Sequence, residues 1–218
     1  MSDPWNDRAA AYRSSVTHAS DPDLDTVVEL CTPGPGVRAL DVATGGGHVA
    51  RRLREAGAEV VTVDAAAGME PDVVSAAEQL PFEDGAFDVV VSRIAPHHFV
   101  RIADAVSEMA RVARDVVVVE DTLYTSPDVE EAEKLRDPTH VRSYSEAEWR
   151  GFFAGAGLEV EHVEYFRKTH DTADWLARTD CDGETAERVR TLLRGVSSAD
   201  GTTWQDTKII LKGRKARD

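Results

Sequence analysis

The sequence has few cysteines and few basic residues for its number of acids. Its 218 residues include only two cysteines, Cys31 and Cys181, which are too few for a disulfide framework or a thiolate zinc site. Lys and Arg number 25 against 40 Asp and Glu, which gives a formal net charge of −15. Phosphate contacts and anionic lipid both require a basic face. This charge balance therefore argues against nucleic acid and membrane surfaces as partners.

Long apolar runs are also missing. No stretch approaches the roughly 18 apolar residues that a membrane span requires, and Met1–Ala11 lacks the basic-then-apolar pattern of a signal peptide. We therefore expect a cytoplasmic protein that does not insert into a membrane. With 42% hydrophobic and 30% charged residues, the chain has a globular composition, and its length fits one domain over residues 1–218. The sequence gives no indication of the oligomeric state.

Apolar strands and amphipathic helices alternate along most of the chain. Strands are expected at Val37–Val42, Glu59–Val63, Val73–Val74, Phe87–Val91, Val116–Val119, Leu158–Phe166 and Thr207–Leu211, and helices at Leu24–Cys31, His48–Ala56, Ile102–Ala113, Ser145–Ala156 and Thr185–Leu193. Such alternation predicts an α/β fold with helices on both faces of a mostly parallel sheet. Only a helical segment separates the last two strands, so we expect these to form an antiparallel edge.

A glycine-rich turn carries the sharpest motif. The segment Ala39–His48 reads as a strand, a turn with Gly45 and Gly47, and the start of a helix. Glycines let the backbone approach a ligand closely, and a helix N-terminus offers free N–H groups. Asp64 follows nineteen residues after Gly45, where a carboxylate can accept hydrogen bonds from both hydroxyls of a ribose. These features alone are also compatible with a nicotinamide dinucleotide.

Asp41 favours a different ligand. It ends the first strand just before the glycines, where its carboxylate would repel a pyrophosphate but not a sulfonium with an α-amino group. The spacing Asp41-x-Ala43-x-Gly45-x-Gly47 resembles motif I of the class I S-adenosylmethionine (SAM)-dependent methyltransferases. That family usually has Gly where this chain has Ala43.

Further segments resemble the ubiquinone/menaquinone-biosynthesis branch of these enzymes. They are residues 77–90 before the fourth strand, residues 92–99 after it, residues 11–19 near the N-terminus and residues 137–145 in a later loop. The resemblance implies a Rossmann-like, doubly wound, seven-stranded sheet over residues 33–218, with an antiparallel last strand and an N-terminal helical lid over residues 1–32. It implies a SAM site, with S-adenosylhomocysteine as the product. The implied cofactor-binding residues are Tyr12, Asp41, Ala43, Thr44, Gly45, Gly47, Asp64, Ala65, Ala77, Glu78 and Arg93.

One departure from the family concerns the adenine end of this site. Only 13 residues lie between Asp64 and Glu78, where the family fits a helix and a strand. We expect little more than a turn there. The family's adenine-binding Asp corresponds to Ala76, so backbone groups near Ala77 or the Glu78 side chain are its expected replacements.

Three histidines are candidate catalytic residues. His97 and His98 follow the fourth strand and His140 lies in the loop after the fifth, at the edge where open α/β sheets bind ligands. A histidine there can act as a general base or orient a substrate hydroxyl, or simply pack in the structure. These histidines and Asp121 lack metal-ligand spacing on any one element, so no metal site is expected. Six aromatic residues are candidates for an apolar acceptor pocket or for the core, namely Trp149, Phe152, Phe153, Tyr165, Phe166 and Trp175.

The sequence therefore predicts SAM-dependent methylation of a small-molecule acceptor by in-line displacement. Two alternatives stay open. A non-catalytic SAM-fold binding or regulatory protein would share the pocket but show no turnover. A nicotinamide-dependent oxidoreductase would bind NAD and not S-adenosylhomocysteine. The acceptor, and whether its methylated atom is carbon, oxygen or nitrogen, does not follow from the sequence.

Overall fold

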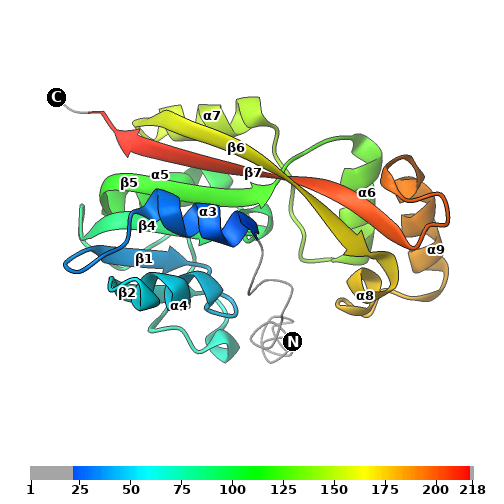
Figure 1. Cartoon of the computed structure of the whole chain (residues 1–218), viewed down its shortest axis with the longest axis horizontal. Helices are drawn as coiled ribbons and strands as arrows, with labels where there is room; N and C mark the ends of the chain where they lie inside the picture. Colours follow the sequence, from blue (N-terminus) through cyan, green and yellow to red (C-terminus); the bar gives the residue numbers. More distant parts are fainter. Residues whose placement is uncertain (1–21, 217–218) are drawn as a thin grey trace.

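A single twisted sheet of seven strands runs through the computed structural model, which describes residues 22–216 (Figure 1). The strand order is β3-β2-β1-β4-β5-β7-β6. The strands are β1 (Arg38–Val42), β2 (Glu59–Asp64), β3 (Val73–Val74), β4 (Phe87–Arg93), β5 (Ala113–Thr122), β6 (Leu158–Asp171) and β7 (Thr203–Lys215). Between them lie α3 (Pro22–Cys31), α4 (His48–Glu55), α5 (Ile102–Val112), α6 (Pro127–Arg136), α7 (Glu146–Gly155), α8 (Thr172–Ala177) and α9 (Gly183–Leu192), with short 3-10 turns η1 (Ala67–Met69), η2 (Pro96–His98) and η3 (Leu193–Val196).

The directions of the strands confirm the predicted sheet. Strands β3, β2, β1, β4 and β5 pair in parallel, whereas β7 is antiparallel to both β5 and β6. The carboxyl ends of β1, β2, β4 and β5 therefore meet at one edge of the sheet. The candidate site residues after these strands are brought to that edge.

Helices cover both faces of the sheet, which explains the near-continuous apolar strands. On one face, α5 and α7 contribute Met109 and Trp149 to a core that also includes Leu40 of β1. On the other face, α3 and α4 pack through Leu24 and Leu53. Alternate residues of each strand thus enter different cores, as the period of two requires.

A third core lies beyond the end of the sheet. There α6, α8 and α9 lie around the far halves of β6 and β7 (Figure 1), and Trp204 of β7 is part of this core. The sequence predicted these two strands as Leu158–Phe166 and Thr207–Leu211, and both are longer. Residues 167–171 are polar, but their backbone pairs continuously with β7, so the strand continues without an apolar pattern.

Two local predictions are confirmed. Ser145 and Glu148 form a reciprocal capping box at the start of α7. The short stretch after Asp64 holds only η1 and the two-residue β3.

The predicted lid over residues 1–32 is only partly within the described chain. Residues 1–21, and with them Tyr12, lie outside it. Residues 22–31 form α3, which packs on the sheet, so a lid over the cofactor stays a prediction for the preceding residues. Within residues 22–216, no helix is long and apolar enough to cross a membrane.

Candidate active site

The glycine-rich turn between β1 and α4 is held by the carboxylate of Asp41. Oδ2 of Asp41 accepts hydrogen bonds from Thr44 Oγ1 at 2.6 Å and from the backbone N–H of Ala50 at 3.2 Å. Gly45 and Gly47 both have positive φ, at 49° and 70°, which glycine adopts without strain. Burial raises the pKa of Asp41 to about 6, against the opposing effect of its Thr44 and Ala50 hydrogen bonds. The aspartate therefore fixes the shape of this turn as well as facing the cavity beside it.

Asp64 ties the end of β2 to the same turn. Its Oδ2 accepts from the backbone N–H of Gly45 at 2.9 Å, and its Oδ1 from that of Ala66 at 2.9 Å. Asp64 also lines the cavity, together with Gly45 and Ala65. This is the position at which the sequence predicts the ribose.

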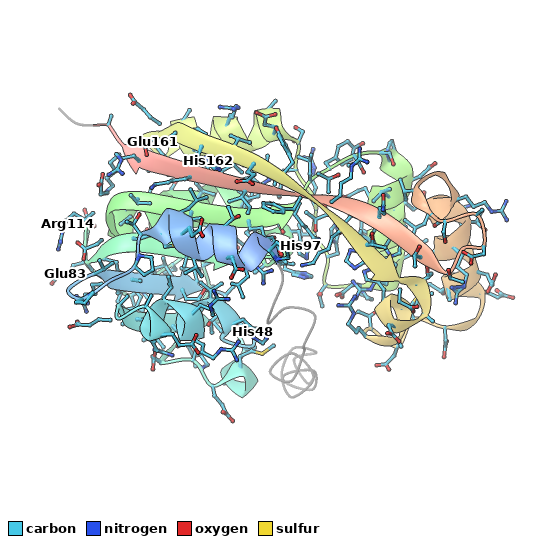
Figure 2. All side chains as sticks on the ribbon, in the orientation of Figure 1. His48, Glu83, His97, Arg114, Glu161 and His162 are labelled. Atoms are coloured by element: carbon cyan, nitrogen blue, oxygen red, sulfur yellow. The ribbon has the colours of Figure 1, made fainter. Side chains whose placement is uncertain are left out.

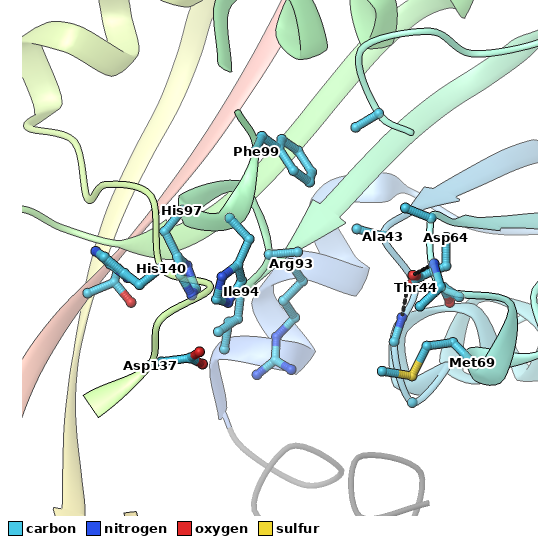
Figure 3. A pocket seen from close by; sticks show the side chains of 18 of the residues that line it. Ala43, Thr44, Asp64, Met69, Arg93, Ile94, His97, Phe99, Asp137 and His140 are labelled. Atoms are coloured by element: carbon cyan, nitrogen blue, oxygen red, sulfur yellow. Dashed lines mark hydrogen bonds between the residues drawn. The ribbon is translucent and has the colours of Figure 1, made fainter. Parts of the chain in front are cut away.

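One cavity of about 370 Å³ connects this turn with the candidate histidines. Figure 3 shows Thr44, Asp64 and Met69 on one side, His97 and His140 on the other. Of the predicted cofactor residues in the described chain, those that line the cavity are Asp41, Ala43, Thr44, Gly45, Asp64, Ala65, Ala77, Glu78 and Arg93. Gly47, the N-cap of α4, does not line it.

Arg93 lies between the two sides, in a buried ionic network (Figure 3). Its guanidinium contacts Asp23 of α3 at 2.7 Å and Glu120 of β5 at 2.6 Å, and its side chain is only 5% exposed. Burial raises the pKa of Glu120 to about 8. Burial acts in the same direction on Asp23, but hydrogen bonding to Glu120 and the charges of Arg93 and Lys168 hold the Asp23 pKa well below its usual range. Arg93 was predicted to bind the cofactor, and this network shows that it also ties α3 to the sheet.

The three predicted histidines gather at the other side of the cavity. The ring of His97 lies 4.1 Å from that of His98 and 5.3 Å from that of His140, centroid to centroid. His98 Nδ1 lies 3.0 Å from the carbonyl oxygen of Thr139, and His140 Nε2 lies 3.3 Å from Glu130 Oε1. Their positions after the fourth and fifth strands predicted that they lie near the acceptor, and all three line the cavity.

His97 alone among them is paired with a fully buried carboxylate. Its Nδ1 lies 2.5 Å from Oδ1 of Asp121, the penultimate residue of β5. Burial raises the pKa of Asp121 to about 7 and lowers the pKa of His97 well below its usual value. The neutral imidazole is therefore the favoured form of His97, and Asp121 fixes the orientation of its ring.

The far wall of the cavity comes from elements that the sequence did not connect with the site. It is formed by Thr122 of β5, Glu133, Arg136 and Asp137 at α6, Trp175 and Arg178 at α8, and His170, Asp206 and Lys208 of the β6–β7 hairpin. Of the six aromatic candidates for this wall, Trp175 is the one that lines it. Trp149 and Phe153 belong to the core under α7. The far wall is therefore more polar than the apolar pocket that the six aromatic candidates would have formed.

Residues 22–216 contain no group of three or more His, Cys, Asp or Glu side chains placed to hold a metal ion. In the histidine cluster, the ring nitrogens with close partners face Asp121, Glu130 and the Thr139 carbonyl. The cluster is therefore organised by hydrogen bonds.

Comparison with known proteins places this site in a family. Residues 40–118, from β1 to β5, match the model of the methyltransferase domain. The uncharacterized methyltransferase YcgJ of Bacillus subtilis (strain 168) is 28% identical over 219 residues, which cover 90% of this chain and 85% of the relative. The structure of a proposed methyltransferase from Bacillus halodurans C-125 superposes with a TM-score of 0.81 at 29% identity and covers 90% of this chain and 100% of that one. Residues 40–118 therefore carry a methyltransferase domain, and the chain resembles class I methyltransferases in sequence and in fold.

Its resemblance to the ubiquinone/menaquinone-biosynthesis branch is also supported. The demethylmenaquinone methyltransferase of Beutenbergia cavernae is 37% identical over 90 residues, which cover 37% of this methyltransferase and 38% of the relative. The shared part is thus a minority of both chains. The family uses SAM as methyl donor, which favours the methyltransferase interpretation over the nicotinamide alternative.

Proposed function

We propose that this methyltransferase transfers the methyl group of SAM to a small-molecule acceptor, with His97 as the general base. The observation that carries this proposal is the single cavity that joins the Asp41–Gly45 turn and Asp64 with the His97–Asp121 pair. A methyl transfer requires donor and acceptor to meet in line within one water-excluding space.

The residues at the turn fit SAM. Gly45 lines the cavity, and the position of a Cβ atom on it has no neighbour within 4 Å among the described residues, so the backbone is open to a ligand there. Asp64 would hold the ribose hydroxyls and Asp41 would lie near the methionine amino group. Met69 and Ala77 would lie against the adenine, beside the shortened segment. Bound SAM supplies an electrophilic methyl group on a sulfonium.

The chain's own contribution to the chemistry is alignment and proton removal. His97 Nε2 takes the proton of the acceptor's nucleophilic atom, while Nδ1–H donates to the Asp121 carboxylate. A protonated Asp121 would instead donate to Nδ1 and leave the proton on Nε2, where it blocks the base. Because the pKa of Asp121 is raised by burial to about 7, we expect turnover to rise with pH through about 7 and then level off.

Calorimetry with S-adenosylhomocysteine, SAM and NAD tests the cofactor assignment. We expect micromolar binding of the first two and no heat with NAD. The matched pair Asp64→Asn and Asp84→Asn separates the site from general charge effects, because Asp84 is 82% exposed and does not line the cavity. Binding of NAD without SAM, or an equal loss of SAM affinity in both variants, would overturn the assignment.

A screen of acceptors with isotopically labelled SAM separates an enzyme from a non-catalytic SAM-binding protein. Methylated product that depends on His97 supports the proposed mechanism. Tight SAM binding with no turnover on any acceptor class would favour the regulatory alternative.

A further inference from the structure

The backbone takes an unusual conformation at the residue that follows β4. Ile94 has a φ of 50°, in the left-handed region where β-branched residues are rarely found. Its N–H donates to the carbonyl oxygen of Glu120 at 2.8 Å, one step beyond the pairing of Arg93 with Glu120 between β4 and β5. Glycine would adopt this conformation without strain. The isoleucine side chain at this position therefore requires a reason of its own.

That reason is not a hydrophobic core. Ile94 belongs to none of the three cores of the described chain, although the next residue, Ala95, packs against the core that α5 and α7 share with the sheet. The side chain of Ile94 is only partly buried, and it lines the cavity. Residues held in strained conformations concentrate at functional sites. Ile94 thus presents apolar surface to the cavity rather than to the interior of the protein.

Ile94 stands where the strand order of the sheet reverses. Strands β1 and β4 are neighbours, but β2 lies beyond β1 on one side and β5 beyond β4 on the other. Open α/β sheets bind their ligands in the crevice at such a point. Ala43 and Ile94 are the first residues after β1 and β4, both have positive φ, and both line the cavity. The Ile94 side chain is therefore part of the crevice itself.

Ile94 also lies between the two halves of the proposed site. In Figure 3, Ile94 and Arg93 lie between His97 on one side and Thr44 and Asp64 on the other. The proposed function requires the methyl group to pass between these halves, from a sulfonium held at the glycine-rich turn to the atom that His97 deprotonates. An apolar side chain at this place borders the space that the alkyl group of the sulfonium would occupy.

We infer that Ile94 restricts the alkyl group of the sulfonium cofactor to methyl. Its side chain fills the space beside that group, so a longer alkyl chain has to displace the side chain or shift the cofactor. One additional methylene in a filled apolar space lowers the affinity about tenfold or more. This inference deepens the proposed function and rests on it.

Calorimetry with SAM and its S-ethyl analogue, S-adenosylethionine, tests this restriction in the absence of any acceptor. We expect the wild-type protein to bind SAM at least about tenfold more tightly than the ethyl analogue. Similar affinities for the two would overturn the inference. S-Adenosylhomocysteine, which carries no alkyl group on sulfur, is measured first, and its failure to bind would identify a failure of the proposed cofactor site instead.

Variants of Ile94 locate the preference for methyl. Ile94→Ala and Ile94→Gly should reduce it to less than threefold, because both open space beside the alkyl group. Val100→Ala is the matched control and should keep the wild-type ratio, since Val100 lines the same cavity but is 74% exposed. An undiminished preference in the folded Ile94 variants, or an equal reduction in Val100→Ala, would overturn the assignment to Ile94. The wild-type comparison stands even where a variant does not fold.

Urea unfolding of the free variants gives a second readout, which needs no cofactor. Ile94→Gly should unfold at a higher urea concentration than Ile94→Ala, because glycine adopts a positive φ without strain and alanine does not. The opposite order would contradict the left-handed backbone that places this side chain in the crevice.

Discussion

The two halves of the cavity are built in different ways. The cofactor half consists mainly of backbone and short side chains from β1, β2 and the turns that follow them. The hydrogen bonds described above for Asp41 and Asp64 reach residues at most nineteen positions away. The acceptor half consists of long polar side chains from β5, α6, α8, β6 and β7, such as Lys208, which bonds to Thr122 across 86 positions. Figure 2 shows His97 between the sheet and the three outer helices, and His48 near α4 on the cofactor side.

We expect the cofactor half to be common to the family and the acceptor half to determine which acceptor a given member prefers. A strand-turn-helix unit places its backbone N–H groups by local geometry alone, so it serves any acceptor. The acceptor half depends on tertiary packing of three helices on a hairpin, so a few side-chain changes there alter the preferred substrate. Function in such folds lies in the site grafted on the scaffold.

The largest effect on stability is expected from replacing Arg93, which lies between the two halves of the cavity. Arg93→Met leaves Asp23 and Glu120 buried without their guanidinium, and removal of one partner of a buried pair costs about 3–5 kcal/mol. Urea unfolding measures this loss. The control is Arg101→Met, whose partner Asp104 is exposed, and it should change the stability by less than about 1 kcal/mol. Equal small losses in both variants would contradict a structural role for the network.

Within the acceptor half, His97→Ala should reduce turnover about 10²-fold, the usual contribution of a general base. The affinity for S-adenosylhomocysteine should stay near that of the wild type, because His97 lies at the other side of the cavity. His98→Ala and His140→Ala are the comparison variants and should lose less, since neither has a hydrogen bond to the Asp121 carboxylate. Near-wild-type kcat in all three variants would mean that catalysis here is alignment alone.

The opposite pattern is expected for the cofactor half. Asp64→Ala removes the acceptors of the ribose hydroxyls and two hydrogen bonds of the turn, and should weaken S-adenosylhomocysteine binding by about 1–3 kcal/mol. Asp84→Ala is the control and should leave this affinity unchanged, because Asp84 is exposed and does not line the cavity. An equal loss of affinity in both variants would contradict the role of Asp64.

A stability measurement tests the raised pKa of Asp121, the buried carboxyl group of the acceptor half. Burial raises the pKa of Asp121 to about 7 from a model-compound value of 3.8, so the folded state favours the protonated form. Wild-type stability that is present near pH 4 is then lost as the pH rises through about 7. Asp121→Asn does not ionise and should raise Tm by a few degrees at pH 8, and by much less at pH 5. An equal shift at both pH values would contradict the raised pKa.

The smallest effect is expected at Ala43, where the family usually has Gly. Ala43 has a positive φ of 55°, which costs a non-glycine residue about 1–2 kcal/mol, against about 0.5–1 kcal/mol of entropy that glycine loses on folding. Ala43→Gly should therefore stabilise the protein by up to about 1.5 kcal/mol in urea unfolding. Ala56→Gly, at a φ of −80°, should instead be destabilising. Equal signs would contradict the strain.

The same contrast explains what the sequence could predict. Asp41, Gly45 and Asp64 stand at fixed spacings around two strand ends, so their convergence follows from local structure. His97, His98 and His140 follow parallel strands, whose carboxyl ends meet at one edge. The predicted sheet, its short third strand and its antiparallel last strand are confirmed for the same reason.

The wall residues escaped prediction because their meeting depends on distant packing. The late strands were predicted from apolar residues alone, which left Asp206 outside the last strand and His170 outside the one before it. An alternation of polar residues that continues a strand, as in Asp206-x-Lys208, was the available indication. The pairing of Asp121 with His97 was not predicted, because it depends on how β4 and β5 align.

The long strands β6 and β7 belong to more than one hydrophobic core. Ile209 and Leu211 lie in one core of the sheet and Ile210 in the other, and Trp204 on the same strand lies in the core of the outer helices. If either the sheet or the group of α6, α8 and α9 separates from this hairpin, apolar residues of the hairpin that pack in the other region lose support as well. The unfolding of the two regions is therefore thermodynamically linked. The chain should consequently unfold as one cooperative unit, although its helices form two groups in space.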